Sequence, residues 1–346
     1  MKTYFLDEHG AMSLKDIPAP EPTEHNAIVK VDATSICGTD FRAFMYGNTK
    51  IKPPLVLGHE NAGTVVHAGV FAKAHGLEVG ARVTVVPAIG CGDCWPCSVG
   101  RTNMCDLLIT LGFQHCGAFA EYMEIPQQAI KMGNVLSIPQ GVSLENAVLA
   151  EPAACALNAQ SYLNISKGDF VVIYGGGFVG CLHAEFAFAS GADRVVIVEV
   201  SEERRIIAKQ MVTYAHVIDP ATDTPTQVSK LTGGRGANVV ITAVSVAATH
   251  VESLRIASKM GRISLFGGIP GDGKGYLDSN LIHYNELSVY GAHATTASMM
   301  KDVLNRVDAG TLNLKKYITR KFPLLDIEKG FMALRDENAM KVVLYP

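Results

Sequence analysis

The sequence lacks the features that mark membrane, secreted and nucleic-acid-binding proteins. Its most apolar stretch, residues 170–192, is broken by glycines, a histidine and a glutamate, whereas a membrane span needs about 20 nearly uninterrupted apolar residues. The first ten residues hold Lys2, Asp7, Glu8 and His9 instead of the apolar core of a signal peptide. No segment is rich in lysine or arginine and the formal net charge is −3, so we expect neither nucleic acid nor a membrane as a partner.

The chain also has no internal repeat and no low-complexity segment, and its composition is that of a large globular protein. It has 346 residues, of which 48% are hydrophobic and 18% are charged. This length exceeds what one hydrophobic core usually organises, so we expect two domains. We expect the partners to be small molecules.

From Asp169 onward, short apolar runs alternate with segments of helical length. Six runs predict strands: 170–174, 194–199, 216–219, 238–244, 262–266 and 287–292. The segments 178–190, 202–211 and 247–260 predict helices between them. Strands that alternate with helices form a parallel sheet covered on both faces, so we predict the doubly wound fold of dinucleotide-binding domains.

Residues 1 to about 150 differ, because short β-rich runs there are separated by Gly, Pro and Asn turns. This part predicts a mostly β domain. After about residue 295 the sequence predicts a helix over 299–309, a strand over 318–323, a helix over 324–335 and a final strand from 341.

A GxGxxG pattern begins at Gly175, directly after the first predicted strand of the second part. Gly175 permits the tight turn, Gly177 lets a pyrophosphate approach the backbone, and Gly180 lets helix and strand pack closely. The phosphate charge then meets free N–H groups at the helix N-terminus. An ordinary glycine turn is the alternative interpretation of the pattern on its own.

Glu199 ends the next predicted strand, 24 positions after Gly175. A carboxylate there accepts hydrogen bonds from both ribose hydroxyls of NAD and repels the 2′-phosphate of NADP, so we predict NAD. A solvated charge is the alternative for Glu199, and Arg204 leaves a minor NADP activity open. Gly267 lies either beside the cofactor or in a plain turn. The candidate cofactor-binding residues are Gly175, Gly177, Phe178, Val179, Gly180, Glu199, Arg204 and Gly267.

Four of the eight cysteines, Cys91, Cys94, Cys97 and Cys105, form a C-x2-C-x2-C-x7-C pattern. Four thiolates close a tetrahedron around one zinc at roughly 2.3 Å each and leave no position for a substrate, so we predict a structural zinc that orders the lobe 90–106. Free buried thiols and an iron–sulfur cluster are the alternatives. Metal-binding thiols in a long chain without a secretory signal favour a reducing, cytoplasmic location.

A second set of candidate ligands is dispersed: Cys37, His59, Glu60 and Glu151. Each residue alone proves little, since a lone cysteine is usually packed, a lone histidine is usually structural and a lone glutamate is usually solvated. A catalytic zinc needs three mixed S, N and O ligands and one open position, and these side chains are of the required types.

The segment GHE-x2-G-x5-G that begins at Gly58, followed by Gly80 and Val83, resembles the zinc signature of the medium-chain dehydrogenase/reductase superfamily. The resemblance covers the whole chain. The Cys-Gly-Thr-Asp element at 37–40, the four-cysteine lobe, the segment 118–122, the Glu-Pro pair at 151–152 and the GxGxxG pattern all occur in the family's order. Glu60 and the segment 150–156 are most similar to sorbitol (L-iditol) and related polyol dehydrogenases.

This resemblance implies a Rossmann domain with a doubly wound parallel sheet, at 154–295, and a mostly β, GroES-like catalytic domain formed by 1–153 and 296–346. It also implies two zinc ions per chain, NAD and a homodimer or homotetramer. The activity that it implies is the oxidation of a secondary alcohol of a polyol to a ketone, with zinc as a Lewis acid and the nicotinamide as the hydride acceptor.

In the polyol dehydrogenases the residues that match Cys37, His59 and Glu60 bind zinc with a water molecule as the fourth ligand. Glu151 would contact that water or replace it as a ligand; its alternative role is a charge that favours a helix start. Thr39 matches the hydroxyl that begins the family's proton relay, and its alternative role is to cap the following helix.

The chain departs from the family at two positions. Arg42 stands where many relatives carry the histidine that ends the relay, so we expect the relay to end in water. Arg42 is either solvated or recognises an anionic substrate. Gly291, followed by His293, replaces a substrate-binding arginine of mammalian-type sorbitol dehydrogenases. Further candidates for the substrate pocket are Phe44, Phe113, Phe119 and His293.

Three other functions stay open. The Cys-Gly-Thr-Asp element and the cysteine lobe are also similar to L-threonine 3-dehydrogenases, although Arg42 and the Glu-Pro pair argue against that branch. A galactitol-1-phosphate dehydrogenase-like enzyme would use Arg42 as a phosphate contact. A non-catalytic zinc- and dinucleotide-binding protein is the third, since a fold does not guarantee activity. A zinc-ribbon nucleic-acid binder is disfavoured by the acidic charge balance.

Overall fold

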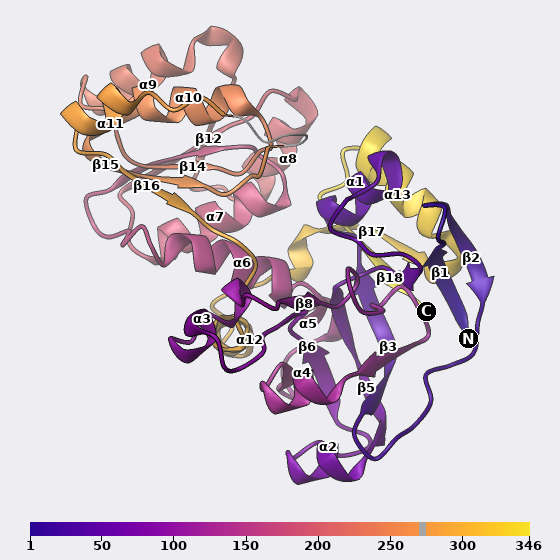
Figure 1. Cartoon of the computed structure of the whole chain (residues 1–346). Helices are drawn as coiled ribbons and strands as arrows, with labels where there is room; N and C mark the ends of the chain where they lie inside the picture. The colour runs from indigo at the N-terminus through magenta and orange to yellow at the C-terminus, as the bar shows by residue number, and fades with distance from the viewer. Residues whose placement is uncertain (270–274) are drawn as a thin grey trace. The chain divides into compact units, whose positions relative to one another are not determined.

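The structure is a computed structural model that describes residues 1–269 and 275–346 (Figure 1). These residues form two compact units. The first comprises Met1–Ala154 and Ala294–Pro346, and the second comprises Cys155–His293. Within the described ranges, no helix has the length and apolar character that crossing a membrane requires.

The second unit is built on six parallel strands in the order β13-β12-β11-β14-β15-β16. The strands are β11 (Phe170–Tyr174), β12 (Arg194–Val198), β13 (His216–Ile218), β14 (Ala237–Thr242), β15 (Ala257–Leu265) and β16 (Ser288–Gly291). The order starts in the middle of the sheet, runs to one edge and then to the other, as in dinucleotide-binding domains. The predicted doubly wound fold is confirmed.

Helices cover both faces of this sheet, with α10 and α11 on one face and α7 on the other (Figure 1). The helices of the unit are the C-terminal part of α6 (Ala150–Gln160), α7 (Phe178–Ala189), α8 (Glu202–Met211), α9 (Thr224–Thr232), α10 (Ala247–Ile256) and α11 (Ser279–Tyr284). Because both faces are covered, β11 reads as a continuous apolar run, and Val171, Val172 and Ile173 are fully buried.

The prediction of a helix through Met260 is wrong at its C-terminal end. Helix α10 stops at Ile256, and residues 257–260 already belong to β15. Ala257 pairs with Ala237 of β14, and Met260 has a positive φ of 61° that a helix cannot contain. Strand pairing therefore overrides the local pattern of apolar residues here.

The first unit is mostly β, as predicted. Its largest sheet has seven strands, ordered β10-β6-β5-β3-β18-β17 with β9 also paired to β3, and a smaller sheet is ordered β2-β1-β4. The strands are β1 (Lys2–Leu6), β2 (Met12–Asp16), β3 (Ala27–Ser35), β4 (Leu55–Val56), β5 (Glu60–Ala68), β6 (Arg82–Val85), β7 (Ala88–Ile89), β8 (Ile109–Thr110), β9 (Tyr122–Ile125), β10 (Val135–Ser137), β17 (Ile318–Pro323) and β18 (Lys341–Tyr345).

Short helices join these strands, and the C-terminal tail adds two longer ones. The helices are α1 (Gly38–Tyr46), α2 (Val70–Ala74), α3 (Trp95–Ser98), α4 (Gln127–Lys131), α5 (Leu144–Val148), α12 (Ala297–Asp308) and α13 (Ile327–Asp336). The predicted helix over 324–335 is divided into a 3₁₀ turn, Leu324–Asp326, and α13.

The last strand places the C-terminal tail in the sheet of the first unit. Strand β18 pairs antiparallel with β3, with Val343 opposite Ser35, and parallel with β17. Residues Val342 to Leu344 are fully buried. Strand β3 therefore lies between β5 and β18, two strands that are far apart in the sequence, and the side chains at the ends of all three strands meet.

Candidate active site and metal centres

The side chains of Cys37, His59 and Glu60 come together at the end of the β3–β5 pair. Ser35, the last residue of β3, lies opposite Glu60, the first residue of β5. Cys37 follows two residues later and caps helix α1. One ligand atom from each of the three side chains lies within 4.8 Å of the others, and His59 and Glu60 are buried.

Asp40 supports two of these side chains. Its Oδ1 lies 3.3 Å from Nδ1 of His59, an ion-pair contact without the alignment of a hydrogen bond. Its Oδ2 accepts a hydrogen bond of 3.0 Å from the backbone N–H of Cys37. Burial opposes a charge on His59, but Asp40 and Cys37 outweigh this and raise the pKa of His59 well above its usual value. A carboxylate that orients a histidine is common at metal sites.

Lys341 forms a buried ion pair with Glu60. Its Nζ lies 2.6 Å from Oε1 of Glu60, and the exposed fractions of the two side chains are 5% and 0%. Ser35 donates a further hydrogen bond to the Glu60 carboxylate. Burial acts to lower the pKa of Lys341, but the charges of Glu60, Cys37 and Glu151 together raise it.

Asp40 and Lys341 were not predicted from the sequence as site residues. Asp40 lies in the Cys-Gly-Thr-Asp element, where its spacing from Cys37 allows a capping box. Lys341 is a single cation before the apolar residues of the last strand. This position is the only feature of the sequence that could have identified Lys341 as a site residue.

Glu151 is not a member of the cluster of possible ligands. It occupies the first turn of α6 and is buried, with an exposed fraction of 6%. Among the described residues the group of possible ligands holds Cys37, His59 and Glu60, and Glu151 is outside it. The charge of Glu151 nevertheless acts on Lys341. Of the two glutamates named as alternatives for the third ligand, the geometry favours Glu60.

Thr39 lies inside helix α1, and Cys37 is the N-cap residue. The alternative role of Thr39 as a helix cap is therefore wrong. The Oγ1 of Thr39 accepts a hydrogen bond of 3.1 Å from Nη2 of Arg42, one turn later in the helix. Arg42 is exposed, so its guanidinium can contact both this hydroxyl and an incoming anion.

Of the aromatic residues predicted to line the substrate pocket, Phe113 lies beside the ligand cluster. Its ring is edge-on to that of His59, with centroids 5.5 Å apart. Phe44 instead stacks on Phe331 in the hydrophobic core, with centroids 4.4 Å apart. Phe119 is fully buried against Gly58, so its assignment to the pocket is wrong. His293 belongs to the other unit.

Cys91, Cys94, Cys97 and Cys105 form a second cluster, with their sulfur atoms within 4.8 Å of one another. Backbone N–H groups point at the sulfurs: Asp93 and Cys94 donate to Cys91, and Leu107 donates to Cys105. These donors lower the pKa of the Cys91 thiol to about 7, whereas burial raises that of Cys97 to about 12.

Both clusters suit zinc by the chemistry of their donors. Four sulfurs within 4.8 Å of one another, with N–H groups directed at them, match a closed structural site. The cluster of one thiol, one imidazole and one carboxylate matches a site with three protein ligands. All eight cysteines are free of disulfides, so the thiols of both sites are available as ligands.

The GxGxxG segment joins β11 to α7 as predicted. Gly175 has a φ of 105°, a conformation that favours glycine. A Cβ on Gly180 would lie 1.8 Å from the carbonyl oxygen of Gly175, so only glycine allows this packing. A Cβ on Gly177 would meet nothing within 4 Å, so the space beside this residue is open. Phe178 and Val179 form the first turn of α7.

Glu199 lies next to this glycine segment. Its Oε2 accepts a hydrogen bond of 2.7 Å from the backbone N–H of Gly176, and its Oε1 accepts one of 2.9 Å from that of Ser201. Arg204 lies in the first turn of α8, and its backbone N–H is bonded to Ser201. Arg205 instead forms an ion pair with Asp219, at 2.9 Å.

Gly267 also lies at this end of the sheet. Its N–H donates to the carbonyl of Thr242, and a Cβ on it would lie 2.2 Å from the carbonyl oxygen of Val244. The side chain of Val244 in turn lies beside Gly175. The carboxyl ends of β11, β14 and β15 therefore meet around glycines, which is where the doubly wound fold binds its ligand.

Comparison with known proteins gives two family matches and close relatives. The model of the alcohol dehydrogenase GroES-like domain matches residues 23–136, and that of the zinc-binding dehydrogenases matches residues 179–309. The L-threonine 3-dehydrogenase of Pyrococcus furiosus is 35% identical over 97% of this chain and 95% of its own length. The sorbitol dehydrogenase of Halalkalibacterium halodurans is 29% identical over 100% of this chain and 99% of its own length.

Among solved structures, a putative zinc-binding dehydrogenase from Sinorhizobium meliloti, bound to NADP, superimposes with a TM-score of 0.90. It is 29% identical and the match covers 100% of this chain and 99% of that chain. The matches to these relatives cover nearly the full length of the chain and therefore both units. The chain therefore belongs to the zinc-dependent alcohol dehydrogenases of the medium-chain dehydrogenase/reductase superfamily, and it is an oxidoreductase.

Proposed function

We propose that this enzyme interconverts a secondary alcohol of a polyol and the corresponding ketone, with NAD(H) as its cofactor. The observation that carries the proposal is the cluster formed by Cys37 and the buried side chains of His59 and Glu60, with the backbone N–H of Thr39 bonded to the sulfur of Cys37. Its donor types match a zinc site that keeps a position open for a substrate hydroxyl.

In this proposal Cys37, His59 and Glu60 hold the catalytic zinc, and Cys91, Cys94, Cys97 and Cys105 hold a structural zinc. When bound, the first ion supplies Lewis acidity that lowers the pKa of a substrate hydroxyl, and the nicotinamide accepts the hydride. Glu151 acts as a buried charge near Lys341 and as a contact for the substrate or for water.

The residues of helix α1 would manage the proton. Thr39 takes the substrate proton at its Oγ1 and passes its own proton on. Arg42 donates to the same oxygen, so it stabilises negative charge there while the proton moves. An arginine does not release a proton near neutral pH, so the relay continues into water instead of through a side chain at position 42.

A second candidate substrate is a β-hydroxy amino acid such as L-threonine. Arg42 departs from the L-threonine 3-dehydrogenase branch in residue type, but its exposed guanidinium, which contacts Thr39, can pair with the carboxylate of such a substrate. The L-threonine 3-dehydrogenase relative, at 35% identity, agrees with this candidate. We prefer a polyol, which is uncharged, because the carboxylates of Glu60, Glu151 and Asp40 disfavour the binding of an anionic substrate at this site.

The cofactor assignment depends on Glu199. Its carboxylate lies at the glycine segment, where it would bind the ribose hydroxyls of NAD and repel a 2′-phosphate. We expect Glu199→Gln to raise the KM for NAD roughly tenfold, as expected for loss of a hydrogen bond to a charged group, and to raise the KM for NADP less. An equal change for both cofactors would contradict the assignment.

We further propose that residues 1–153 and 296–346 form one domain and residues 154–295 the other. We also propose that the enzyme is cytoplasmic and that it is a homodimer or homotetramer. The reduced thiols of the two clusters support the location. Cell fractionation and light scattering of the purified protein test these two points.

A substrate panel tests the proposed function. The purified enzyme is given sugar alcohols, phosphorylated polyols and L-threonine with NAD, and NADH absorbance is followed in the wild type and in Thr39→Val. We expect turnover of a sugar alcohol that Thr39→Val greatly reduces. Turnover of threonine alone would replace the polyol by the second candidate, and no turnover of any alcohol would contradict both.

A further inference from the structure

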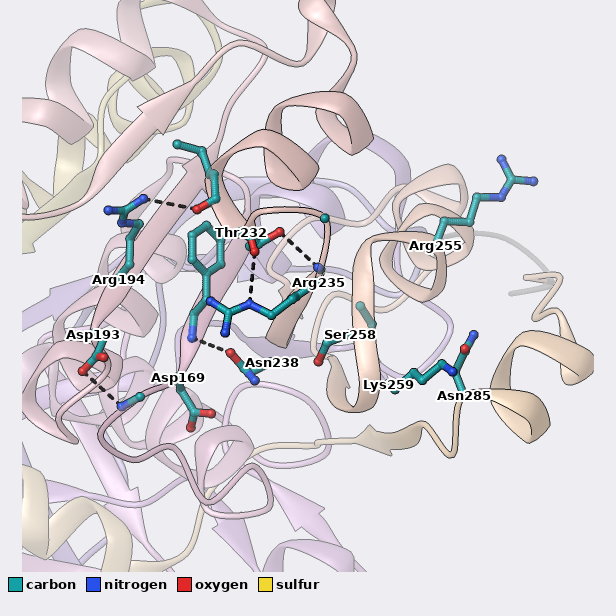
Figure 2. A pocket seen from close by; sticks show the side chains of 16 residues that line it. Asp169, Asp193, Arg194, Thr232, Arg235, Asn238, Arg255, Ser258, Lys259 and Asn285 are labelled. Atoms are coloured by element: carbon teal, nitrogen blue, oxygen red, sulfur yellow. Dashed lines mark hydrogen bonds between the residues drawn. The ribbon is translucent and has the colours of Figure 1, made fainter.

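A hollow of about 880 Å³ is shown in Figure 2 with the side chains that line it. It lies at the end of the six-stranded sheet opposite to the glycine segment. Its walls include Phe170, Arg194 and Ala257, which are the first residues of β11, β12 and β15. The glycine segment follows the last residue of β11, about 13 Å away at roughly 3.3 Å per strand residue. The hollow is therefore separate from the cofactor site.

Cations dominate the lining of this hollow. Arg194, Arg235, Arg255 and Lys259 line it, against the two carboxylates of Asp169 and Asp193. The carboxylate of Asp169 is already paired with a cation outside the hollow, because its Oδ1 forms a 2.5 Å ion pair with Arg262. This concentration of positive charge stands out in a chain whose formal net charge is −3.

The donors of these cations are largely unused. Arg235 bonds the Thr232 carbonyl through Nε only, at 3.2 Å, and its guanidinium lies in the middle of the labelled side chains in Figure 2. Arg255 and Lys259 are exposed, and in the described part of the chain neither side chain forms an ion pair or hydrogen bond.

Neutral donors accompany the cations. The Oδ1 of Asn238 accepts a 2.9 Å hydrogen bond from the N–H of Phe170, so its amide group presents N–H donors to the other side. Ser258 and Asn285 also line the hollow. A Cβ on Gly234 would meet nothing within 4 Å, so this wall is open to a ligand.

We propose that this hollow binds a small anion with two or more negative charges, a phosphate ester or a polycarboxylate. Guanidinium groups pair with both kinds of oxyanion through two parallel hydrogen bonds. The volume is that of a small-molecule pocket, and a concave site of this size favours a metabolite over a macromolecule. The site lies on the cofactor-binding unit but at the opposite edge of the sheet, so the anion and the dinucleotide bind at the same time.

Isothermal titration calorimetry with pyrophosphate and, separately, citrate tests this proposal. The protein is saturated with NADH, so that the glycine segment is occupied, and the ionic strength is held constant. We expect at least one of the two anions to bind. We expect Lys259→Gln and Arg255→Gln each to weaken that binding by roughly tenfold, the usual effect of removing a charge-assisted hydrogen bond.

Lys209→Gln is the matched control, because Lys209 is an exposed cation on α8 of the same unit and is not part of the hollow. It should leave the affinity within about twofold. Both hollow variants are at exposed positions, and their NADH affinity should equal that of the wild type. Binding of pyrophosphate only identifies a phosphate site, and binding of citrate only identifies a carboxylate site. No binding of either anion, or binding that all three variants leave unchanged, would overturn the proposal.

Discussion

Nζ of Lys341 lies 2.6 Å from Oε1 of Glu60, and the two residues are 281 positions apart in the sequence. They meet because β5 and β18 both pair with β3. The ion pair fixes the position of the Glu60 carboxylate next to His59 and Cys37. The C-terminal strand is therefore part of the candidate metal site.

Replacing Lys341 by methionine should destabilise the enzyme. The substitution leaves the Glu60 carboxylate buried without its cation, and breaking a buried pair in this way costs about 3–5 kcal/mol. Urea unfolding followed by circular dichroism measures the change in the free energy of unfolding.

Lys321→Met is the matched control, because Lys321 pairs with Glu145 at 3.2 Å on the surface, with half of its side chain exposed. We expect it to cost less than about 1 kcal/mol. The double variant Glu60→Gln/Lys341→Met should recover part of the loss. Equal effects of Lys341→Met and Lys321→Met would mean that the buried pair contributes little.

Thr39→Val should lower kcat by about 100-fold or more, the usual contribution of a positioned proton-transfer group. The zinc content should not change, since Thr39 is not among the candidate ligands. Thr39→Ser keeps the hydroxyl and should retain most of the activity. If Thr39→Ser were as slow as Thr39→Val, the methyl group would matter and the relay assignment would fail.

The only tryptophan of the chain, Trp95, reports on the cysteine lobe. It begins helix α3, between Cys94 and Cys97, and 76% of its surface is exposed. We expect Cys97→Ser to remove the structural zinc and to change the tryptophan fluorescence, because the lobe has few apolar contacts to order it. Cys116→Ser, at an exposed cysteine outside both clusters, should leave the spectrum unchanged.

His183 should make the enzyme less stable in mild acid. Its ring is fully buried in α7 and its Nε2 has no hydrogen-bond partner among residues 1–269 and 275–346. Burial lowers the pKa of His183 to about 3. Between pH 6.5 and pH 3 the unfolded chain therefore binds a proton that the folded chain does not, and stability falls as the pH falls.

The size of this effect follows from the two pKa values. It is about 2 kcal/mol at pH 5 and close to zero at pH 7. His183→Leu removes it, so the difference in unfolding free energy between His183→Leu and the wild type should grow by about 2 kcal/mol from pH 7 to pH 5. A difference that does not change with pH would show that His183 is not the group responsible.

The doubly wound fold and the position of the glycine segment were predictable from the sequence. Alternating apolar runs and helical segments indicate a parallel sheet covered on both faces, and the GxGxxG pattern lies at the carboxyl end of its first strand. The end of α10 was not predictable, since the residues from Ala257 continue an apolar pattern but pair with β14.

Local sequence patterns also could not predict the residues that support the candidate metal site. Asp40 and Lys341 matter because of what they contact, and those contacts depend on which strands flank β3. That Glu60 belongs to the cluster and Glu151 does not likewise follows from tertiary structure. Residue types and spacing identified the possible ligands, but only the tertiary structure shows which of them lie close enough together to bind one ion.

Zinc content per chain, measured together with NAD-dependent alcohol oxidation, tests whether Cys37 and the four-cysteine cluster each hold a separate zinc ion. We expect two zinc ions in the wild type, one in Cys37→Ser with loss of activity, and one in Cys97→Ser. Glu151→Gln should keep both ions while turnover falls. Two zinc ions in Cys37→Ser, or a single zinc in the wild type, would show that Cys37 does not hold a second, catalytic zinc.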